Sequence, residues 1–223
     1  MDEYLEMLSQ TPLFAEMDRA KIASMLTCLS ATQHAYTRGE YILSAGESVQ
    51  TFGLVLAGAV HVVQEDFWGN QNIIAKIEAG GVFAESYACT PASRLAVSVV
   101  AAENTTILFL NIRRALVTCG LACEHHHTLI RNLVSMLAAK NLILNEKVQH
   151  VSQRSTREKL LSYLSAESRR RGSAAFTIPF NRQQLADYLS VDRSAMSGEL
   201  SRLRREGVLT FHKNQFHLLE ESD

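Results

Sequence analysis

Proline and tryptophan are scarce in this 223-residue chain, which has three Pro and one Trp and no low-complexity tract or Ser/Gly-rich linker. We therefore expect compact domains joined through structured elements. No apolar run approaches the roughly 20 residues of a membrane-spanning helix, and the acidic start lacks the features of a secretory signal. The four cysteines form no paired framework, so we expect a reduced, cytoplasmic protein without membrane contact.

The near-neutral formal charge of −1 hides an uneven distribution. Residues 154–213 carry twelve Lys/Arg against six Asp/Glu, whereas residues 1–153 carry ten against fourteen. A basic C-terminal third is the electrostatic pattern expected of a segment that contacts nucleic-acid phosphates. The charge distribution therefore places a candidate DNA-binding domain in that third.

Residues 181–207 have the pattern of two short helices joined by a tight turn. Asn181, followed three residues later by Gln184, predicts a capping box, and Asp192 is placed to cap the second helix. Apolar residues recur at helical spacing in both segments, at Leu185, Ala186, Leu189, Met196, Leu200 and Leu203. This pattern predicts a helix-turn-helix whose second helix presents its first turns to base edges in the DNA major groove. The alternative is a helical hairpin with a solvated basic face.

A β-hairpin is expected directly after this helix pair. Val208–His212 and Gln215–Leu219 flank the two-residue turn Lys213-Asn214, which completes a winged helix-turn-helix. A further helix is expected before the pair, over about 156–170. The candidate DNA contacts are polar and basic side chains on the predicted outer surfaces, namely Arg182, Gln183, Asp192, Arg193, Ser194, Ser197, Arg202 and Lys213.

The middle of the chain predicts one long helix with an apolar seam. Its seam residues follow one another at alternating spacings of four and three, at Ile130, Val134, Leu137, Asn141, Leu144, Val148 and Val151. This heptad rhythm favours two parallel helices, and Asn141 within it would fix their register and two-stranded state. We therefore expect a homodimer; the alternative is a single amphipathic helix lying on its own domain.

The N-terminal part has short apolar runs separated by glycines. After short helices near 1–8 and 18–29, the expected strands include 53–56, 60–63, 73–75 and 107–110. Short strands separated by turn signals indicate an antiparallel roll or jelly-roll barrel, a fold that can enclose a small ligand.

A roll, a long dimer helix and a winged helix-turn-helix in this order resemble the Crp/Fnr superfamily of bacterial transcription regulators. The strongest local matches are Arg182-Gln183-Gln184-Leu185-Ala186, Asp192-Arg193 and Glu146-Lys147-Val148. The resemblance implies an α+β protein with a cyclic-nucleotide-binding-like jelly-roll (double-stranded β-helix) domain at 1–120, a dimerisation helix at 121–152 and a winged helix-turn-helix domain at 153–223. It also implies a regulator rather than an enzyme, with double-stranded DNA, a second copy of the chain and RNA polymerase as partners.

The family's effector cassette has a Gly-Glu pair, a short helix and an Arg-Ser pair that hold a cyclic nucleotide. In the matching stretch, residues 83–95, Glu85 and Arg94 remain, but Ala84 replaces the glycine and Leu95 the serine. The effector-binding positions implied by the resemblance are Ala84, Glu85, Ser86, Arg94, Leu95, Leu144 and Asn145. The departures argue against cyclic AMP but leave another small-molecule effector as the expectation. A structural ion pair between Glu85 and Arg94 is the alternative.

Other features keep further alternatives open. The family's base-reading positions correspond to Arg193, Ser194 and Gly198, so the operator should differ from that of the best-known member. The Cys119, Cys123 and His125–127 cluster matches no strong zinc-finger spacing, and we expect no metal or other certain cofactor. The alternatives of the same fold are a ligand-independent regulator and a redox-responsive one that uses Cys89. A metal-dependent jelly-roll enzyme would need more histidines in the roll than His34 and His61.

Overall fold

The computed structural model describes residues 2–65, 68, 71–90, 92–111, 113–114 and 124–219. The chain divides into two compact units, Met1–Ala138 and Ala139–Asp223, each considered by itself below. Among the described residues, no helix combines the length and apolar character needed to cross a membrane.

The first unit opens with short helices that support one face of a sheet. Asp18 caps the longest of them by accepting a hydrogen bond from the Lys21 main-chain N–H at 2.8 Å. The elements are η1 (Asp2–Tyr4), α1 (Leu5–Ser9), η2 (Pro12–Phe14) and α2 (Arg19–Cys28). The two short helical regions predicted from the sequence are thus present.

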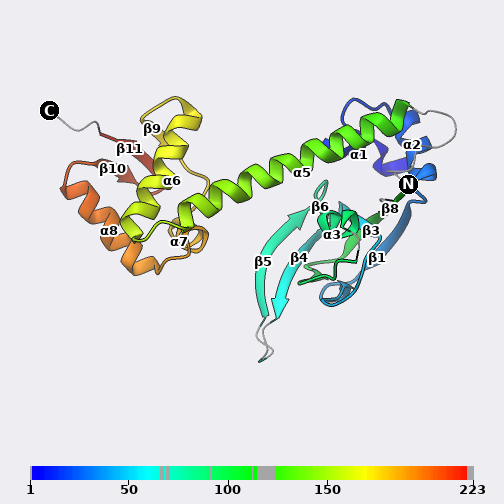
Figure 1. The fold of residues 1–223 in the computed structure, drawn as a ribbon, viewed down its shortest axis with the longest axis horizontal. Helices are drawn as coiled ribbons and strands as arrows, with labels where there is room; N and C mark the ends of the chain where they lie inside the picture. The colour runs from blue at the N-terminus through cyan, green and yellow to red at the C-terminus, as the bar shows by residue number, and fades with distance from the viewer. Residues whose placement is uncertain are drawn as a thin grey trace. The chain divides into compact units, whose positions relative to one another are not determined.

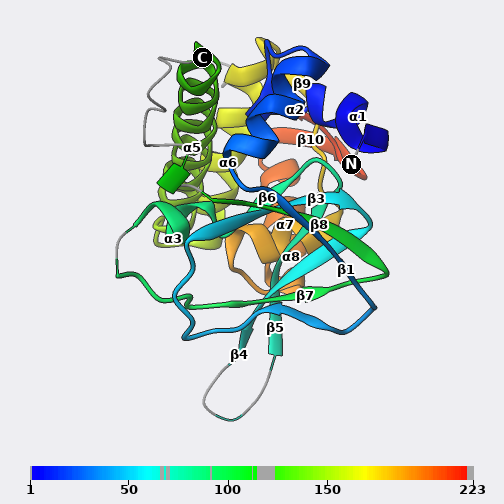
Figure 2. The same ribbon diagram turned by 90° about the vertical axis from the view of Figure 1, so that its right-hand side faces the viewer.

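Two four-stranded antiparallel sheets form the roll (Figures 1 and 2). One sheet has the order β1-β8-β3-β6, built from Thr32–Tyr36, Thr105–Asn111, Thr51–Ala57 and Val82–Phe83. The other has the order β2-β7-β4-β5, built from Tyr41–Leu43, Ser98–Ala101, Ala59–Glu65 and Gln71–Glu78. A short helix, α3 (Glu85–Cys89), follows β6. The predicted jelly-roll architecture is confirmed.

The strands β3 and β8 are apolar on both faces, because each face packs on a different core. Phe52, Leu54 and Leu56 of β3 pack against the N-terminal helices, whereas Val55 points to the interior of the roll. In β8, Leu108 and Leu110 join the helical side and Ile107 the interior. This two-residue alternation is the strand period, and each fully buried side chain contributes about 1.5–3 kcal/mol. The sheet is therefore the central layer of the first unit.

The long helix α5 (Glu124–Val151) begins in the first unit and ends in the second (Figure 1). Leu129 and Leu133 are 2% and 3% exposed and join the helical core of the first unit. Asn132 fixes this segment by donating from Nδ2 to the main-chain oxygens of Leu13 and Ala15, at 3.1 and 2.8 Å. The N-terminal half of α5 is therefore an integral part of the roll unit.

The described part of the second unit contains the end of α5, three further helices and a three-stranded sheet. The helices are α6 (Thr156–Arg171), α7 (Arg182–Leu189) and α8 (Arg193–Arg205), and the sheet has the order β10-β11-β9, from Leu209–His212, Gln215–Leu218 and Ala175–Thr177. The predicted hairpin is present, with His212 opposite Gln215 across the two-residue turn. Strand β9, which pairs with β11, was not expected from the sequence.

Local capping signals set the limits of these helices as predicted. The Asn181 side chain accepts from the Gln184 main-chain N–H at 3.0 Å, while the Gln184 side chain accepts from the Asn181 N–H at 2.9 Å. Asp192 accepts from the Ala195 N–H at 2.8 Å and so begins α8. Ser190, with φ of 53°, makes the turn between the two helices. Each such cap contributes about 1 kcal/mol.

One apolar core joins the three helices to the sheet. Leu185, Leu189, Met196, Leu200 and Leu203 are all 0% exposed, as the helical spacing predicted. They pack with Leu160 and Leu164 of α6 and with Leu209 and Phe216 of the hairpin. The helix pair is therefore held rigidly by a common core, with the opposite side of α8 left to solvent.

Candidate nucleic-acid interface and effector site

The start of α8 exposes two side chains next to a firm cap. Arg193 and Ser194 are both exposed. Ser194 Oγ donates to Asp192 Oδ1 at 2.5 Å, and this bond, followed by the Ala195 N–H, lowers the pKa of Asp192. Asp192 therefore stays ionised at the positive end of the helix, where a carboxylate is stabilised by the helix dipole. The cap fixes the direction in which Arg193 leaves the helix.

The following turns of α8 expose fewer side chains that are free to contact DNA. Half-buried Ser197 donates from Oγ to the Arg193 main-chain oxygen at 2.9 Å, so its hydroxyl is partly used within the helix. A Cβ added at Gly198 would meet no atom within 4 Å, which shows that this position faces open space. Arg202 is 60% exposed and lies 3.1 Å from Glu199, whose side chain is 11% exposed. Because Glu199 also pairs with Arg157 at 3.3 Å, it keeps a cationic partner when Arg202 turns to another group.

Arg182 has a different environment from the one expected of a plain surface cation. Its guanidinium lies over the rings of Phe211 and Phe216, with its central carbon 4.7 and 5.1 Å from their centroids. Partial burial lowers the pKa of Arg182, which nevertheless stays charged near neutral pH. This cation–π contact ties the start of α7 to the hairpin. Stacking leaves the guanidinium edges able to donate, so phosphate contact stays a prediction.

The remaining predicted DNA contacts lie on the surface of the same unit. Gln183 is exposed and donates from Nε2 to Asp187 Oδ1 at 2.8 Å. Lys213 is exposed at the hairpin turn, with φ of 53°. The Arg204 guanidinium lies 5.2 Å from the Phe211 centroid, on the same ring that Arg182 contacts. The helix pair and the hairpin therefore present several cations from one compact core.

The candidate effector segment begins with a left-handed residue. Ala84, immediately before α3, has φ of 62° and ψ of 8°. An L-residue in this conformation is less stable by about 1–2 kcal/mol than glycine is. The family's glycine at this position therefore has a conformational reason, and the alanine of this chain keeps the turn despite that strain.

We expect Ala84→Gly to raise the free energy of unfolding by about 0.5–1 kcal/mol. Relief of the left-handed strain exceeds the entropy that glycine adds to the unfolded chain. Urea unfolding followed by circular dichroism measures the change. The matched control is Ala88→Gly within α3, which should destabilise the protein by about 1 kcal/mol. A lower stability for Ala84→Gly would contradict this explanation.

The other cassette residues differ in their exposure. Glu85 and Leu95 are buried, at 5% and 3% exposure, whereas Ser86 and Arg94 are exposed. Arg94 Nη1 donates to the Gly46 main-chain oxygen at 2.8 Å. The neighbouring Leu95 exchanges main-chain hydrogen bonds with the turn at 46–47. Arg94 thus reaches across from one loop to another at the surface of the roll.

Cys89, at the end of α3, lies in an environment that reduces thiol reactivity. Burial and, secondarily, the Glu85 charge raise the pKa of its thiol. Because the thiolate is the reactive form, a raised pKa lowers its reactivity near neutral pH. The environment of Cys89 therefore does not favour the redox-responsive alternative.

Leu144 and Asn145, the long-helix positions assigned to the effector site, belong to the second unit. Leu144 is 60% exposed, and Asn145 Nδ2 donates to Asn141 Oδ1 at 2.8 Å. Cys119 and Cys123 of the candidate metal cluster lie outside the described residues. His126 is 3% exposed, His127 exposed and His125 half-buried. Within the described ranges, no three His, Cys, Asp or Glu side chains are grouped to hold a metal ion.

A roll, a long helix and a winged helix-turn-helix with an exposed, capped second helix define a DNA-binding transcription regulator. Two family models match the chain: the cyclic nucleotide-binding domain at residues 33–116 and the Crp-like helix-turn-helix domain at residues 158–222. Together they span about two thirds of the sequence, and the chain belongs to the Crp/Fnr family of transcription regulators, which are not enzymes. No curated protein matches the sequence significantly.

Several solved structures share the fold over nearly the whole chain. The catabolite activator protein of Thermus thermophilus is 21% identical, with 94% of each chain covered and a TM-score of 0.50. The c-di-GMP-responsive regulator CLP of Xanthomonas campestris is 14% identical, with 91% of this chain and 100% of that chain covered and a TM-score of 0.56. A CooA mutant from Carboxydothermus hydrogenoformans is 18% identical, with 97% and 91% covered and a TM-score of 0.55. At these identities the likeness concerns the fold.

Proposed function

We propose that two copies of this chain bind one DNA site, with Arg193 of each reading a base edge in the major groove. The observation that carries this proposal is the exposed Arg193 at the capped start of α8, on a helix whose opposite face is fully buried. A guanidinium in this position can donate two hydrogen bonds to the O6 and N7 atoms of guanine. Ser194 and Ser197 would contribute shorter contacts, while Arg182, Gln183, Arg202 and Lys213 would bind phosphates.

Dimerisation is proposed through the heptad positions of α5. Val134, Leu144 and Val148 are 58%, 60% and 59% exposed, which is unusual for apolar side chains repeated along one helix. Asn141 lies in the same row and would pair with its counterpart to fix a two-stranded register. A second copy of the chain would cover this row, as two-fold DNA half-sites require.

We propose a small-molecule effector other than cyclic AMP for the segment from Ala84 to Leu95. The buried Leu95 offers no hydroxyl where the family pattern has a serine, while Glu85 and Arg94 retain opposite charges near the short helix. Calorimetry with cyclic AMP, cyclic GMP and c-di-GMP tests this assignment. Tight binding of cyclic AMP would overturn it. We also propose cytoplasmic action through RNA polymerase, as the regulator assignment implies.

The DNA-reading proposal is tested with Arg193→Ala. Sequences retained by the wild-type protein are first selected from random DNA, and affinities are then measured on the best site. Loss of a bidentate base contact should weaken binding by about 1–3 kcal/mol, or roughly 5–150-fold, and relax the preference at one base pair of each half-site.

The matched control for this measurement is Arg169→Ala. Arg169 is also an exposed arginine of the second unit, but it lies on α6 rather than on the helix pair. Its replacement should change affinity little and leave the selected sequence unaltered. An Arg193→Ala protein with unchanged affinity and footprint would remove Arg193 from its proposed role.

A further inference from the structure

A pocket of about 420 Å³ is lined entirely by residues of the second unit, whereas the candidate effector segment 84–95 belongs to the first. Its walls come from the end of α5, from α6, from the segment before α7 and from α7 itself. Most of the lining is apolar or aromatic, including Ile143, His150, Tyr163, Phe180 and Tyr188. A volume of this size falls within the range of small-molecule sites.

The rings form one continuous aromatic wall. Tyr188 lies 5.0 Å from Phe180 and 5.4 Å from Tyr163 between ring centroids, and His150 meets Tyr163 edge-on at 5.6 Å. His150 is 2% exposed, and its Nδ1 lies 2.8 Å from Ser162 Oγ. Burial lowers the pKa of His150, so this ring is neutral near pH 7. Such a wall offers flat, apolar surface to a planar ring.

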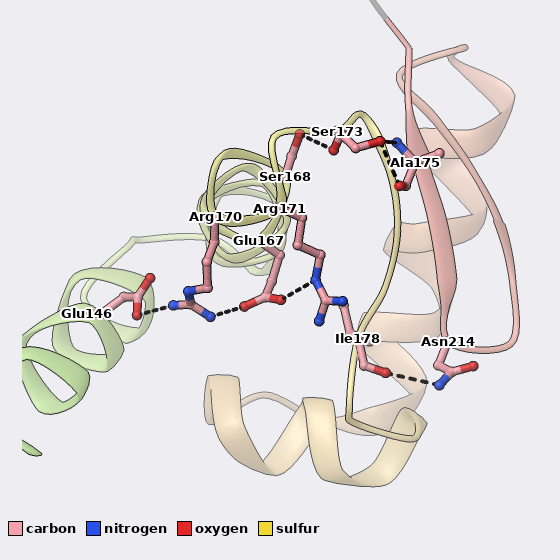
Figure 3. A network of polar contacts seen from close by, with 9 residues as sticks. All are labelled: Glu146, Glu167, Ser168, Arg170, Arg171, Ser173, Ala175, Ile178 and Asn214. Atoms are coloured by element: carbon pink, nitrogen blue, oxygen red, sulfur yellow. Dashed lines mark hydrogen bonds and ion pairs between the residues drawn. The ribbon is translucent and has the colours of Figure 1, made fainter. Parts of the chain in front are cut away.

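The charged residues that line the pocket pair with one another. Arg170 of α6 forms ion pairs with Glu146 of α5 and with Glu167, which also lies 3.3 Å from Arg171 Nε (Figure 3). Glu167 is 4% exposed, and its two oxygens are each engaged by an arginine. Because these opposite charges already satisfy one another, a charged ligand would have to break existing pairs. The pocket therefore favours a neutral ligand.

One of the residues that line the pocket, Tyr163, has a buried polar atom without a partner. Tyr163 is 4% exposed, and its hydroxyl oxygen makes no hydrogen bond with any of the described residues. A buried hydroxyl without a partner is unfavourable, and native structures rarely keep one without a reason. The neighbouring Tyr188 and His150 hold the Tyr163 ring in place by ring contacts. A ligand with a single hydrogen-bonding group would satisfy this hydroxyl.

We propose that this pocket is a second small-molecule site, which takes a neutral, planar aromatic compound with one hydrogen-bonding substituent. The ring lies against Tyr188 and Phe180, and the substituent bonds to Tyr163 Oη. The ligand touches both the end of α5 and α7, the first helix of the helix-turn-helix, so its binding favours the arrangement of these helices in which the pocket is formed. The proposal does not rest on the effector proposed for the roll.

Fluorine NMR of para-fluorobenzamide with the full-length protein tests the proposal. We expect saturable broadening of the probe signal, with a Kd of about 0.1–10 mM for a fragment of this size. The anion para-fluorobenzoate should bind at least about tenfold more weakly, because the local charges are already paired. Tyr163→Phe should weaken binding of the amide by about fivefold through loss of one hydrogen bond.

A variant that fills the pocket tests whether the probe binds there. Ile143→Trp should abolish binding, because Ile143 lines the pocket but is 62% exposed and tolerates a larger side chain. Leu142→Trp is the matched control: Leu142 is its neighbour on α5, is 69% exposed and does not line the pocket. Binding should persist in this control. The proposal is overturned by absence of saturable binding, by binding that survives Ile143→Trp, or by equal affinity for the amide and the anion.

Discussion

Leu200→Ala is expected to destabilise the DNA-binding unit by about 2–5 kcal/mol. Leu200 is 0% exposed in α8 and lies in the core that joins the helix pair to α6 and the hairpin. Truncation removes buried apolar surface and leaves a cavity that the rigid surroundings fill only in part. Because all residues of this core belong to the second unit, we expect the loss of stability to be confined to that unit.

Hydrogen exchange followed by mass spectrometry measures this effect by region. At a loss of about 3 kcal/mol, peptides from α6 to β11 should exchange roughly 100-fold faster where exchange reports opening of the whole unit. Peptides from β1 to β8 should keep the wild-type rates. Arg205→Ala, an exposed position in the last turn of the same helix, is the control and should change stability by less than about 0.5 kcal/mol. Equal loss of protection in both units would contradict the confinement of this core.

The helix pair could be predicted from the sequence because its signals are local. Asn181 and Gln184 lie three residues apart, and the capping box that they form needs no distant partner. The spacing of Leu185 and Leu189 likewise depends only on the helical period. Once this face is buried, the exposure of Arg193 follows from the same period. The confirmed features of the helix pair therefore have a physical cause that lies within one or two helical turns.

The contacts that could not be predicted join residues distant in sequence. Arg182 stacks on Phe211 and Phe216, which only the fold of the hairpin brings beneath α7. Strand β9 has three residues and is stabilised by pairing with β11, so its own sequence carries little strand signal. The aromatic wall at Tyr163 and Tyr188 likewise joins separate helices. Such contacts follow from tertiary packing rather than from local preference.

In the roll, too, local features could be predicted from the sequence whereas tertiary contacts could not. Short apolar runs separated by glycines predicted strands such as β3 and β8, but not which face of each strand packs on the helices and which on the roll interior. The left-handed backbone conformation of Ala84 could not be predicted from the sequence either, because an alanine does not indicate a positive φ. For the effector segment, the sequence therefore indicated candidate residues, whereas the fold revealed their burial and backbone conformation.

Val148→Glu is expected to convert the proposed dimer to a monomer. The heptad spacing places Val148 in the seam, where two-fold symmetry would bring two introduced carboxylates close together. Desolvation and repulsion together should cost at least about 3 kcal/mol, which raises the dimer Kd by roughly 100-fold or more. Sedimentation equilibrium measures the shift, and operator affinity should fall with it, because one subunit holds only one half-site.

The matched control distinguishes the effect of a glutamate in the seam from the effect of a glutamate at any exposed apolar position of α5. Leu142, at 69% exposed, is at least as accessible as Val148, at 59%, but falls outside the heptad row on the same helix. Leu142→Glu should therefore leave both the sedimentation behaviour and the operator affinity close to wild type. If both glutamates dissociate the dimer equally, the interface is broader than the heptad row. If neither does, the two copies meet elsewhere, and the exposed apolar row on α5 needs a different partner.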